Sequence, residues 1–336
     1  MQPAPRVLVV GSVMTDMTVS LDRMPAAGET LVGRSFLLGF GGKGANQATM
    51  AALLGAQVSM VACVGADAFG AEAVENLESL GIDTRGVRVL EGTATGVAPI
   101  WVEASGENRI VIVPGANTSM SVEQVEEAFA ASDPPDVVIC QLEIPLPCVR
   151  RALELGREHG ATTILNPAPY VEEAGRLLEL ADWVTPNEVE FDVLSRTLPG
   201  DGDGDGRSAG TLEQQLLQAG RTLRCSLLMT HGERGALLFS AAAAEVRHVG
   251  APPAEVLDTS GAGDAFVGAF ATALARGAED LTAAEAAVSC ASMTVEAPGT
   301  QASFAQAAKR MLDSGVGTFW SGQVPASAGG QTGAGR

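Results

Sequence analysis

Residues 6–11 read RVLVVG, a continuous apolar run that is closed by a glycine. Such a run is typical of a strand that is buried on both faces of a mostly parallel sheet. Further short runs along the chain are rich in β-branched residues or leucine: Val58–Val64, Val137–Leu142, Thr162–Leu165 and Ser226–Thr230.

The stretches between these runs show helical spacing of their apolar residues: Gly44–Leu54, Phe69–Leu80, Pro147–His159 and Leu212–Leu223. Two end signals support helices here. Ser121 stands three residues before Gln124, as in a capping box, and Gly81 stands where a helix would end. Alternating strands and helices predict an α/β fold with a central, mainly parallel sheet between helices.

Two stretches interrupt this alternation. Residues 15–40 alternate apolar residues with turn-forming glycine and proline, and residues 95–113 carry VAPIWVE, a polar SGEN and RIVIV, which predicts a β-hairpin. We therefore expect a small β-sheet, formed by about residues 14–40 and 95–113, on a single α/β domain that spans residues 1–320.

Two segments are too polar or too rich in glycine to pack. Residues 199–210 read PGDGDGDGRSAG, and the DxDxDG within them opens like a calcium loop but lacks the carboxylate at the twelfth position. We expect a solvated acidic loop there. Residues 321–336 are a Gly/Ala/Ser/Gln stretch that predicts a disordered tail.

The charge balance excludes two classes of partner. Forty acidic against twenty-one basic side chains give a formal net charge of -19, which repels nucleic acid and anionic membrane surfaces. No apolar run approaches the roughly 18 to 20 residues of a membrane helix, and the N-terminus shows no leader pattern. The five cysteines form no C-x-x-C pair, so we expect reduced thiols and a cytoplasmic protein.

Residues 39–44 read GFGGKG, which formally matches a dinucleotide fingerprint. That interpretation fits poorly, because the fingerprint should close the first strand of a βαβ unit. A Walker A loop also fails, since Lys43 is followed by Gly44. The stretch predicts a turn that opens a helix and offers backbone N–H groups, Lys43 and Asn46 to hydroxyls or an anion, and a purely structural turn stays open as an alternative.

Residues 258–264 read DTSGAGD and run into an apolar helix pattern. Small residues let the backbone approach closely at the helix N-terminus, where free N–H groups and the helix dipole stabilise negative charge. Asp264 then lies beside an anion hole. A plain helix-stabilising role for this carboxylate is the alternative.

On these and further motifs, the chain resembles the ribokinases of the PfkB family of carbohydrate kinases, over about Val7 to Phe304. The matching stretches are GSVMTD (11–16), GGKGANQ (41–47), QLE (141–143), NPAP (166–169), PNEVE (186–190), THGERG (230–235), DTSGAGD (258–264) and APGTQ (297–301).

The resemblance implies a fold, an activity and partners. The fold is a central sheet between helices with a small β-sheet lid that closes over the sugar and often forms a homodimer. The implied activity is ATP-dependent phosphorylation of D-ribose at the O5 hydroxyl, with Mg²⁺ and K⁺ as cofactors. A kinase for another small sugar or a nucleoside is the alternative, and a non-catalytic sensor of sugar or nucleotide is a third hypothesis.

The resemblance also implies roles for single residues. Asp264 would be the general base, and the amides of Gly261, Ala262 and Gly263 would form the anion hole. The implied sugar contacts are Met14, Asp16, Gly42, Lys43, Asn46, Glu143 and Asp264.

By the same resemblance, nucleotide and cations bind around these groups. The implied nucleotide contacts are Asn187, Thr230, Gly232, Gly235 and Gly263, and Glu190 would organise water around magnesium. The implied potassium site, built mostly from backbone carbonyl oxygens, comprises Asp258, Ser260, Thr294, Ala297, Gly299 and Ser303.

The chain departs from the family pattern at two positions. Met14 stands where many ribokinases carry asparagine, so a thioether replaces a hydrogen-bonding side chain. His231 stands in the nucleotide loop where a small or apolar residue is common, and we expect its side chain to turn toward solvent.

Overall fold

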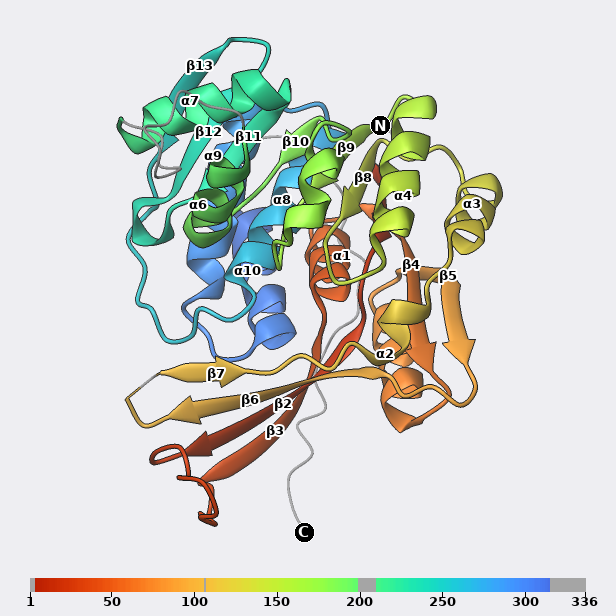
Figure 1. Ribbon diagram of the computed structural model, residues 1–336, viewed down its shortest axis with the longest axis vertical. Coiled ribbons are helices and arrows are strands. Elements are labelled where there is room, and N and C mark those ends of the chain that lie inside the picture. Colours follow the sequence, from red (N-terminus) through yellow and green to blue (C-terminus); the bar gives the residue numbers. More distant parts are fainter. Residues whose placement is uncertain (1–3, 106, 199–209, 315–336) are drawn as a thin grey trace.

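The computed structural model of the chain describes residues 4–105, 107–198 and 210–314 (Figure 1). The expected acidic loop at 201–206 and the expected tail at 321–336 lie outside the described residues. The expected α/β fold is confirmed, since a large, mostly parallel sheet lies between helices and a smaller sheet stands apart from it.

The large sheet has nine strands in the order β13-β12-β11-β10-β9-β8-β1-β4-β5. The strands from β11 to β5 pair in parallel, and β12 and β13 add antiparallel pairs at one edge. Their bounds, in sheet order, are β13 (Glu245–Val249), β12 (Ala236–Ser240), β11 (Ser226–Thr230), β10 (Trp183–Val184), β9 (Thr162–Leu165), β8 (Val137–Cys140), β1 (Arg6–Val10), β4 (Gln57–Gly65) and β5 (Asp83–Leu90).

The run RVLVVG is buried on both faces, as expected. Val7 and Val9 join the core on one face of the sheet, and Leu8 and Val10 join the core on the other. The first face is covered by α1 (Lys43–Leu53), α2 (Ala68–Ser79), α8 (Ala262–Ala275) and α9 (Asp280–Thr294). The second is covered by α3 (Val122–Ala131), α4 (Leu146–Glu158), α5 (Gly175–Leu178), α6 (Glu188–Thr197) and α7 (Leu212–Leu223). A further helix, α10 (Thr300–Ser314), packs over α1, α8 and α9.

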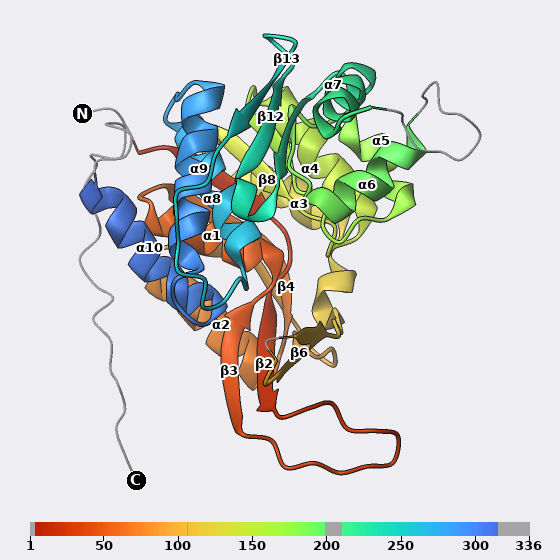
Figure 2. The ribbon, with the colours of Figure 1, turned by 90° about the vertical axis from the view of Figure 1, so that its left-hand side faces the viewer.

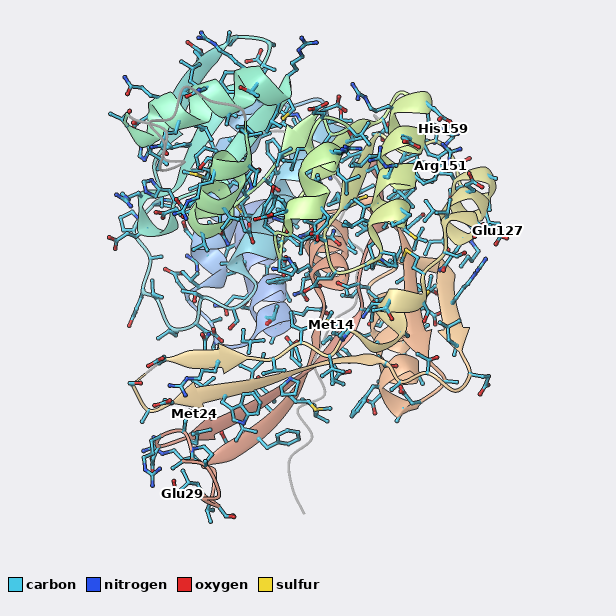
Figure 3. All side chains as sticks on the ribbon, in the orientation of Figure 1. Met14, Met24, Glu29, Glu127, Arg151 and His159 are labelled. Carbon is cyan, nitrogen blue, oxygen red and sulfur yellow. The ribbon has the colours of Figure 1, made fainter. Side chains whose placement is uncertain are left out.

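The smaller sheet has four strands in the order β3-β2-β6-β7 and projects from the body (Figures 1 and 2). The expected hairpin is present, because β6 and β7 pair antiparallel. Met14 lies where this sheet meets the body, and Met24 and Glu29 lie at its far end (Figure 3). The strands are β2 (Met14–Leu21), β3 (Ser35–Gly41), β6 (Gly96–Glu103) and β7 (Asn108–Ile110).

Glycines allow two connections to cross between the sheets. The chain leaves β1 at Gly11 and Ser12 and returns from β3 through Gly42 into α1. Gly42 has φ +88°, and a Cβ on Gly44 would lie 2.5 Å from the backbone nitrogen of Ser12. The GGKG stretch is therefore needed for this close crossing as well as for any ligand.

One local expectation is only half correct. Ser121 does cap α3, since its side chain accepts a hydrogen bond from the backbone nitrogen of Gln124. The Gln124 side chain, however, does not complete a capping box: it donates to the carbonyls of Ala62 and Gly86. The Gln124 side chain bonds to these two strand carbonyls rather than to the helix terminus, because leaving the carbonyls unpaired costs more free energy.

Within the described residues, no helix is both long enough and apolar enough to span a bilayer.

A glycine in α8 gives a test of the packing between α1 and α8. A Cβ on Gly268 would lie 2.6 Å from the carbonyl oxygen of Gln47 and 2.9 Å from the Cβ of Met50. We predict that Gly268→Ala lowers the free energy of unfolding by up to about 2 kcal/mol, because an overpacking cost of about 1–3 kcal/mol outweighs the roughly 1 kcal/mol that alanine gains in a helix.

The matched control is Gly263→Ala in the same helix, where a Cβ meets nothing within 4 Å. Urea unfolding should show this variant to be as stable as the wild type or more stable. Equal midpoints for the two variants would contradict the close packing.

Candidate active site

A pocket of about 210 Å³ lies where several parallel strands end. Ligand sites of open α/β sheets form at this edge because the loops after neighbouring strands converge there. The pocket brings together residues from distant motifs, as the sequence predicted for most of them. Its lining is Lys43, Asn166, Ala168, Thr185, Asn187, Glu190, Thr230, Gly261, Gly263, Asp264 and Val267.

The N-terminus of α8 forms one wall of this pocket. Gly261 is the N-cap with φ +75°, and a Cβ there would lie 2.4 Å from the Cγ2 of Thr300, so the first turn of α10 packs directly on it. Gly263 is exposed and lines the pocket. The amide of Ala262 donates to the carbonyl of Thr259 at 3.3 Å and is therefore engaged in this structure.

Asp264 is only 7% exposed, and each of its carboxylate oxygens accepts a hydrogen bond from an amide side chain of α1. The Nδ2 of Asn46 donates to Oδ2 at 2.9 Å, and the Nε2 of Gln47 donates to Oδ1 at 3.0 Å. Both partners are donors, which suits an ionised carboxylate that can only accept.

Acidic side chains surround Lys43. Glu143 accepts hydrogen bonds from the backbone nitrogen of Lys43 at 2.9 Å and from the Ser12 hydroxyl. Burial acts to lower the pKa of the Lys43 ammonium, yet the negative charges of Asp264, Glu143 and Glu190 raise it above its usual value. Lys43 therefore stays cationic here.

Asp16, on β2, also has a shifted pKa. Its carboxylate lies against Gly41 of β3, where a Cβ would be 2.1 Å from Oδ1. Burial first, and then the charges of Asp264 and Glu143, raise the pKa of Asp16 to about 7. Burial likewise raises the pKa of Glu143 above its usual value.

The N-terminus of α6 forms the opposite wall. Asn187 and Glu190 make a capping box, in which each side chain accepts from the backbone nitrogen of the other at 2.8 and 2.9 Å. Thr230, at the end of β11, bridges to Asn187 in parallel. Burial raises the pKa of the Glu190 carboxyl.

The loop after β11 corrects one expectation. The His231 side chain is 11% exposed, and its Nε2 lies 3.3 Å from a carboxylate oxygen of Glu188, so it does not turn toward solvent. Gly232 has φ +53°. Gly235 has φ +93° and leaves no room for a Cβ, which would lie 2.0 Å from the carbonyl of Val249.

The residues of the implied potassium site lie on the loop before α8, on the loop between α9 and α10 and on the adjoining ends of those two helices. Asp258 accepts from the backbone nitrogens of Ser260 at 2.9 Å and Gly299 at 2.8 Å, which lowers its pKa despite burial. Ala297 donates to the Thr294 carbonyl, and the hydroxyl of Ser303 donates to the Thr300 carbonyl.

In the part of the chain that the structure describes, no group of three or more His, Cys, Asp or Glu side chains is arranged to hold a metal ion. A magnesium ion held by one or two carboxylates together with substrate phosphates does not need such a group. Glu190, which lines the pocket, fits that role.

Met14 is 1% exposed, so its thioether is packed inside the crossing of the two sheets. Asn117 fixes the backbone beside it, accepting from the nitrogen of Val13 and donating to its carbonyl, each at 2.9 Å. The motifs contain Gln47, Gln141, Asn166 and Gln301, yet sequence reasoning assigned these residues no role. In the structure their side chains bond to one another or to the residues around Asp264.

Comparison with known proteins agrees with this geometry. Residues 4–307 match the model of the pfkB family carbohydrate kinases. A deoxyribokinase of Salmonella typhi is 38% identical over 89% of this chain and 95% of its own length, and a ribokinase of Mus musculus is 37% identical over 90% and 93%.

The solved structure of Arabidopsis thaliana ribokinase, complexed with ribose and ATP, superposes with a TM-score of 0.77 at 28% identity. It covers 92% of this chain and 99% of the Arabidopsis chain. This chain therefore belongs to the pfkB family of carbohydrate kinases and is an ATP-dependent sugar kinase.

Proposed function

We propose that this protein is a ribokinase, which transfers the γ-phosphoryl group of ATP to the O5 hydroxyl of D-ribose. The observation that carries the proposal is the buried Asp264 carboxylate in the first turn of α8, in one pocket with Lys43, Glu190 and Gly263. The Arabidopsis relative with ribose and ATP supports both substrates.

In this proposal Asp264 is the general base. It accepts the proton of O5 as that oxygen attacks the γ-phosphorus, and the amides of Gly261, Ala262 and Gly263 meet the charge on the transferring group. For this, the Ala262 amide would have to release the Thr259 carbonyl that it holds in this structure. The helix dipole of α8 adds to this stabilisation. Magnesium bound with ATP would neutralise phosphate charge.

The sugar site uses the residues around the crossing of the two sheets. Asp16 and Glu143 accept hydrogen bonds from ring hydroxyls, while Lys43 and Asn46 donate. Gly42 keeps the turn into α1 open, and Met14 adds an apolar wall.

The nucleotide lies between α6 and α8. Asn187, Thr230, Gly232, Gly235 and Gly263 contact it, and Glu190 orders the water around magnesium. Asn187 and Thr230 follow or end the neighbouring strands β10 and β11 and line one pocket with Gly263 of α8, which supports a single binding surface for the phosphates.

The small sheet acts as the lid and as the dimer interface. Its edge strand β3 and the segment at β7 expose apolar side chains, which is typical of a surface that a partner covers. We infer that a second copy covers them, in a cytoplasmic homodimer. The exposed apolar residues are Val32, Phe36, Leu37, Leu38, Ile110, Val111, Ile112 and Val113.

A second candidate is phosphorylation of 2-deoxyribose. The Salmonella typhi relative is a deoxyribokinase and is as similar to this chain as the mouse ribokinase. Met14 favours this candidate, because a thioether offers little hydrogen bonding to a hydroxyl, so a sugar that lacks one loses less affinity.

A coupled assay over ribose, 2-deoxyribose and a nucleoside tests the function, with Asp264→Asn as the inactive reference. We expect turnover with ribose, and a loss of roughly 10²-fold or more in the variant, because an amide cannot act as the base. Ribose binding, measured by calorimetry, should be nearly unchanged.

Asparagine at 264 also places an NH₂ group against one of the two amide donors, so the variant should lose about 1–3 kcal/mol of stability. Circular dichroism must therefore show that it is folded at the assay temperature. A folded variant with more than about a tenth of the wild-type turnover would remove Asp264 from the role of base.

Sugar affinity should depend on pH through Asp16. Its carboxyl, with a pKa of about 7, is mostly protonated at pH 6 and mostly ionised at pH 8, and the ionised form is the better acceptor for hydroxyls. The dissociation constant for ribose should therefore fall by about tenfold as pH rises from 6 to 8. Calorimetry should show a flat profile for Asp16→Asn, and a flat profile for the wild type would contradict the assignment.

Potassium should activate the enzyme. A cation at the Asp258 and Gly299 loops would fix the turn at Gly261 that aims the anion-hole amides, so turnover or ATP affinity should improve more than ribose affinity. The measurement is initial rate against potassium chloride, at constant ionic strength balanced with a bulky organic cation. Sodium and lithium should substitute poorly, and no response to potassium would exclude the site.

A further inference from the structure

A buried chain of amide side chains lies beneath Asp264. The Nε2 of Gln47 donates both to Oδ1 of Asp264 at 3.0 Å and to Oδ1 of Asn166 at 3.1 Å. The Nε2 of Gln141 donates to Oε1 of Gln47 at 2.6 Å, and Asn166 in turn donates to the carbonyl of Thr185. Every hydrogen-bonding position of the Gln47 amide group is therefore used except one lone pair.

The direction of these hydrogen bonds leaves the side-chain oxygen of Gln141 unpaired. Its Oε1 is buried without a hydrogen-bond partner and faces Gly11, where a Cβ would lie 2.1 Å away. Reversing the amide of Gln141 would turn its oxygen toward the oxygen of Gln47. A buried acceptor left unpaired costs free energy, so the arrangement is retained against a local penalty.

This direction determines which end of the Gln47 amide faces Asp264. With Gln141 donating to its oxygen, Gln47 must present its NH₂ group to the carboxylate. Together with Asn46, it holds one lone pair on each carboxylate oxygen and leaves others for a substrate hydroxyl. The hydrogen bonds from Asn46 and Gln47 thereby fix the side-chain torsions of Asp264.

We propose that Gln47, oriented by Gln141, is a positioning residue for the carboxylate of Asp264. The inference rests on the proposed function, in which Asp264 is the base. Gln47 does not touch substrate in this assignment. It acts by aiming the base, and a misplacement of about 1 Å at a reacting group can cost roughly 10²-fold in rate.

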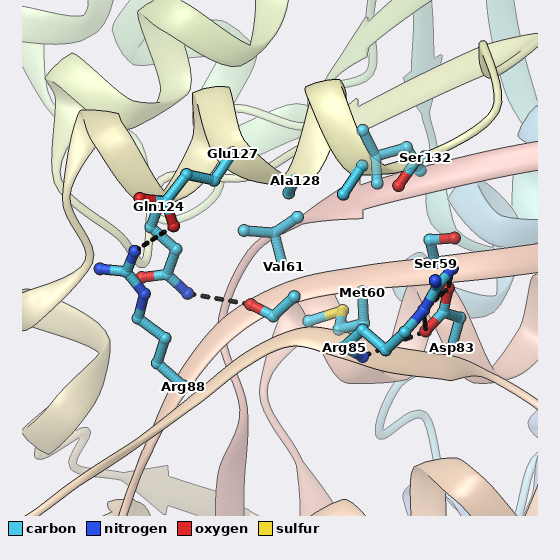
Figure 4. Close-up of a pocket in the computed structure, with 13 residues that line it drawn as sticks. Ser59, Met60, Val61, Asp83, Arg85, Arg88, Gln124, Glu127, Ala128 and Ser132 are labelled. Carbon is cyan, nitrogen blue, oxygen red and sulfur yellow. Dashed lines mark hydrogen bonds and ion pairs between the residues drawn. The ribbon is translucent and has the colours of Figure 1, made fainter.

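A matched control lies elsewhere in the same chain. Gln124 is also buried, and its amide also makes two donor contacts and accepts one weak bond, from the Cys63 thiol. It lines a separate pocket with Arg88 and Glu127, at the edge of the large sheet (Figure 4). Gln124→Met therefore removes the same chemical group from an equally buried position.

The experiment compares Gln47→Met, Gln141→Met and Gln124→Met. We expect Gln47→Met to lower kcat by roughly 10- to 100-fold, with dissociation constants for ribose and a non-hydrolysable ATP analogue within about threefold of the wild type. Calorimetric stoichiometry confirms that the lost turnover is not an unfolded fraction. Gln124→Met should lose thermal stability yet keep kcat.

A double-variant cycle separates positioning from general damage. In the Asp264→Asn background, Gln47→Met should cause no further loss of the residual rate, because its effect passes through the missing carboxylate. A further loss of tenfold or more would overturn the proposal. So would a Gln47→Met enzyme with at least half of the wild-type kcat.

Failure of the base assignment and failure of the positioning role give different results. If Asp264→Asn retains turnover, the base assignment fails. If Asp264→Asn is inactive but Gln47→Met is fully active, only the positioning role fails. Should Gln47→Met not fold, Gln141→Met decides, since it removes the unpaired Oε1 of Gln141, which offsets the loss of its one hydrogen bond to Gln47. A kcat reduced by at least threefold supports the proposal, and an unchanged kcat overturns it.

Discussion

A carboxylate buried between two helices is the constraint on which the site depends. Asp264 lies in the first turn of α8, and its charge is offset by the helix N-terminus and by Asn46 and Gln47 of α1. These short side chains reach it only because α1 and α8 pack closely at Gly268. The glycines at the crossing of the two sheets bring α1 to that place. The close packing of α1 against α8 is therefore needed both for the fold and for the hydrogen bonds that Asp264 accepts.

The charged groups around Asp264 bear on how an acidic protein can bind an anionic nucleotide. Asp264, Glu143 and Glu190 act together on Lys43, while burial, and then the charges of Asp264 and Glu143, raise the pKa of Asp16 to about 7. Lys43 and the N-terminus of α8 supply positive charge in this pocket, where the net charge of -19 does not.

Two side chains behave differently from their local pattern, for the same reason. Gln124 leaves the helix end that Ser121 caps and bonds to two buried strand carbonyls, while His231 turns toward Glu188 of another element. In each case a partner distant in sequence satisfies the polar group better than water or the nearest turn. Local signals give the ends of elements, but they carry no information about such partners.

The sequence by itself determined the α/β class and the hairpin of the small sheet, because apolar periodicity and turn signals act over a few residues. Several residues that line the pocket, among them Asn187, Thr230 and Glu190, were implied only by the resemblance of short motifs to a family. The order of the strands, the shifted pKa of Asp16 and the amide chain from Gln141 through Gln47 to Asp264 were decided only by the tertiary structure. The amide chain joins groups 90 or more residues apart, and the energies of all these features depend on distance, burial and donor direction, which no stretch of sequence contains.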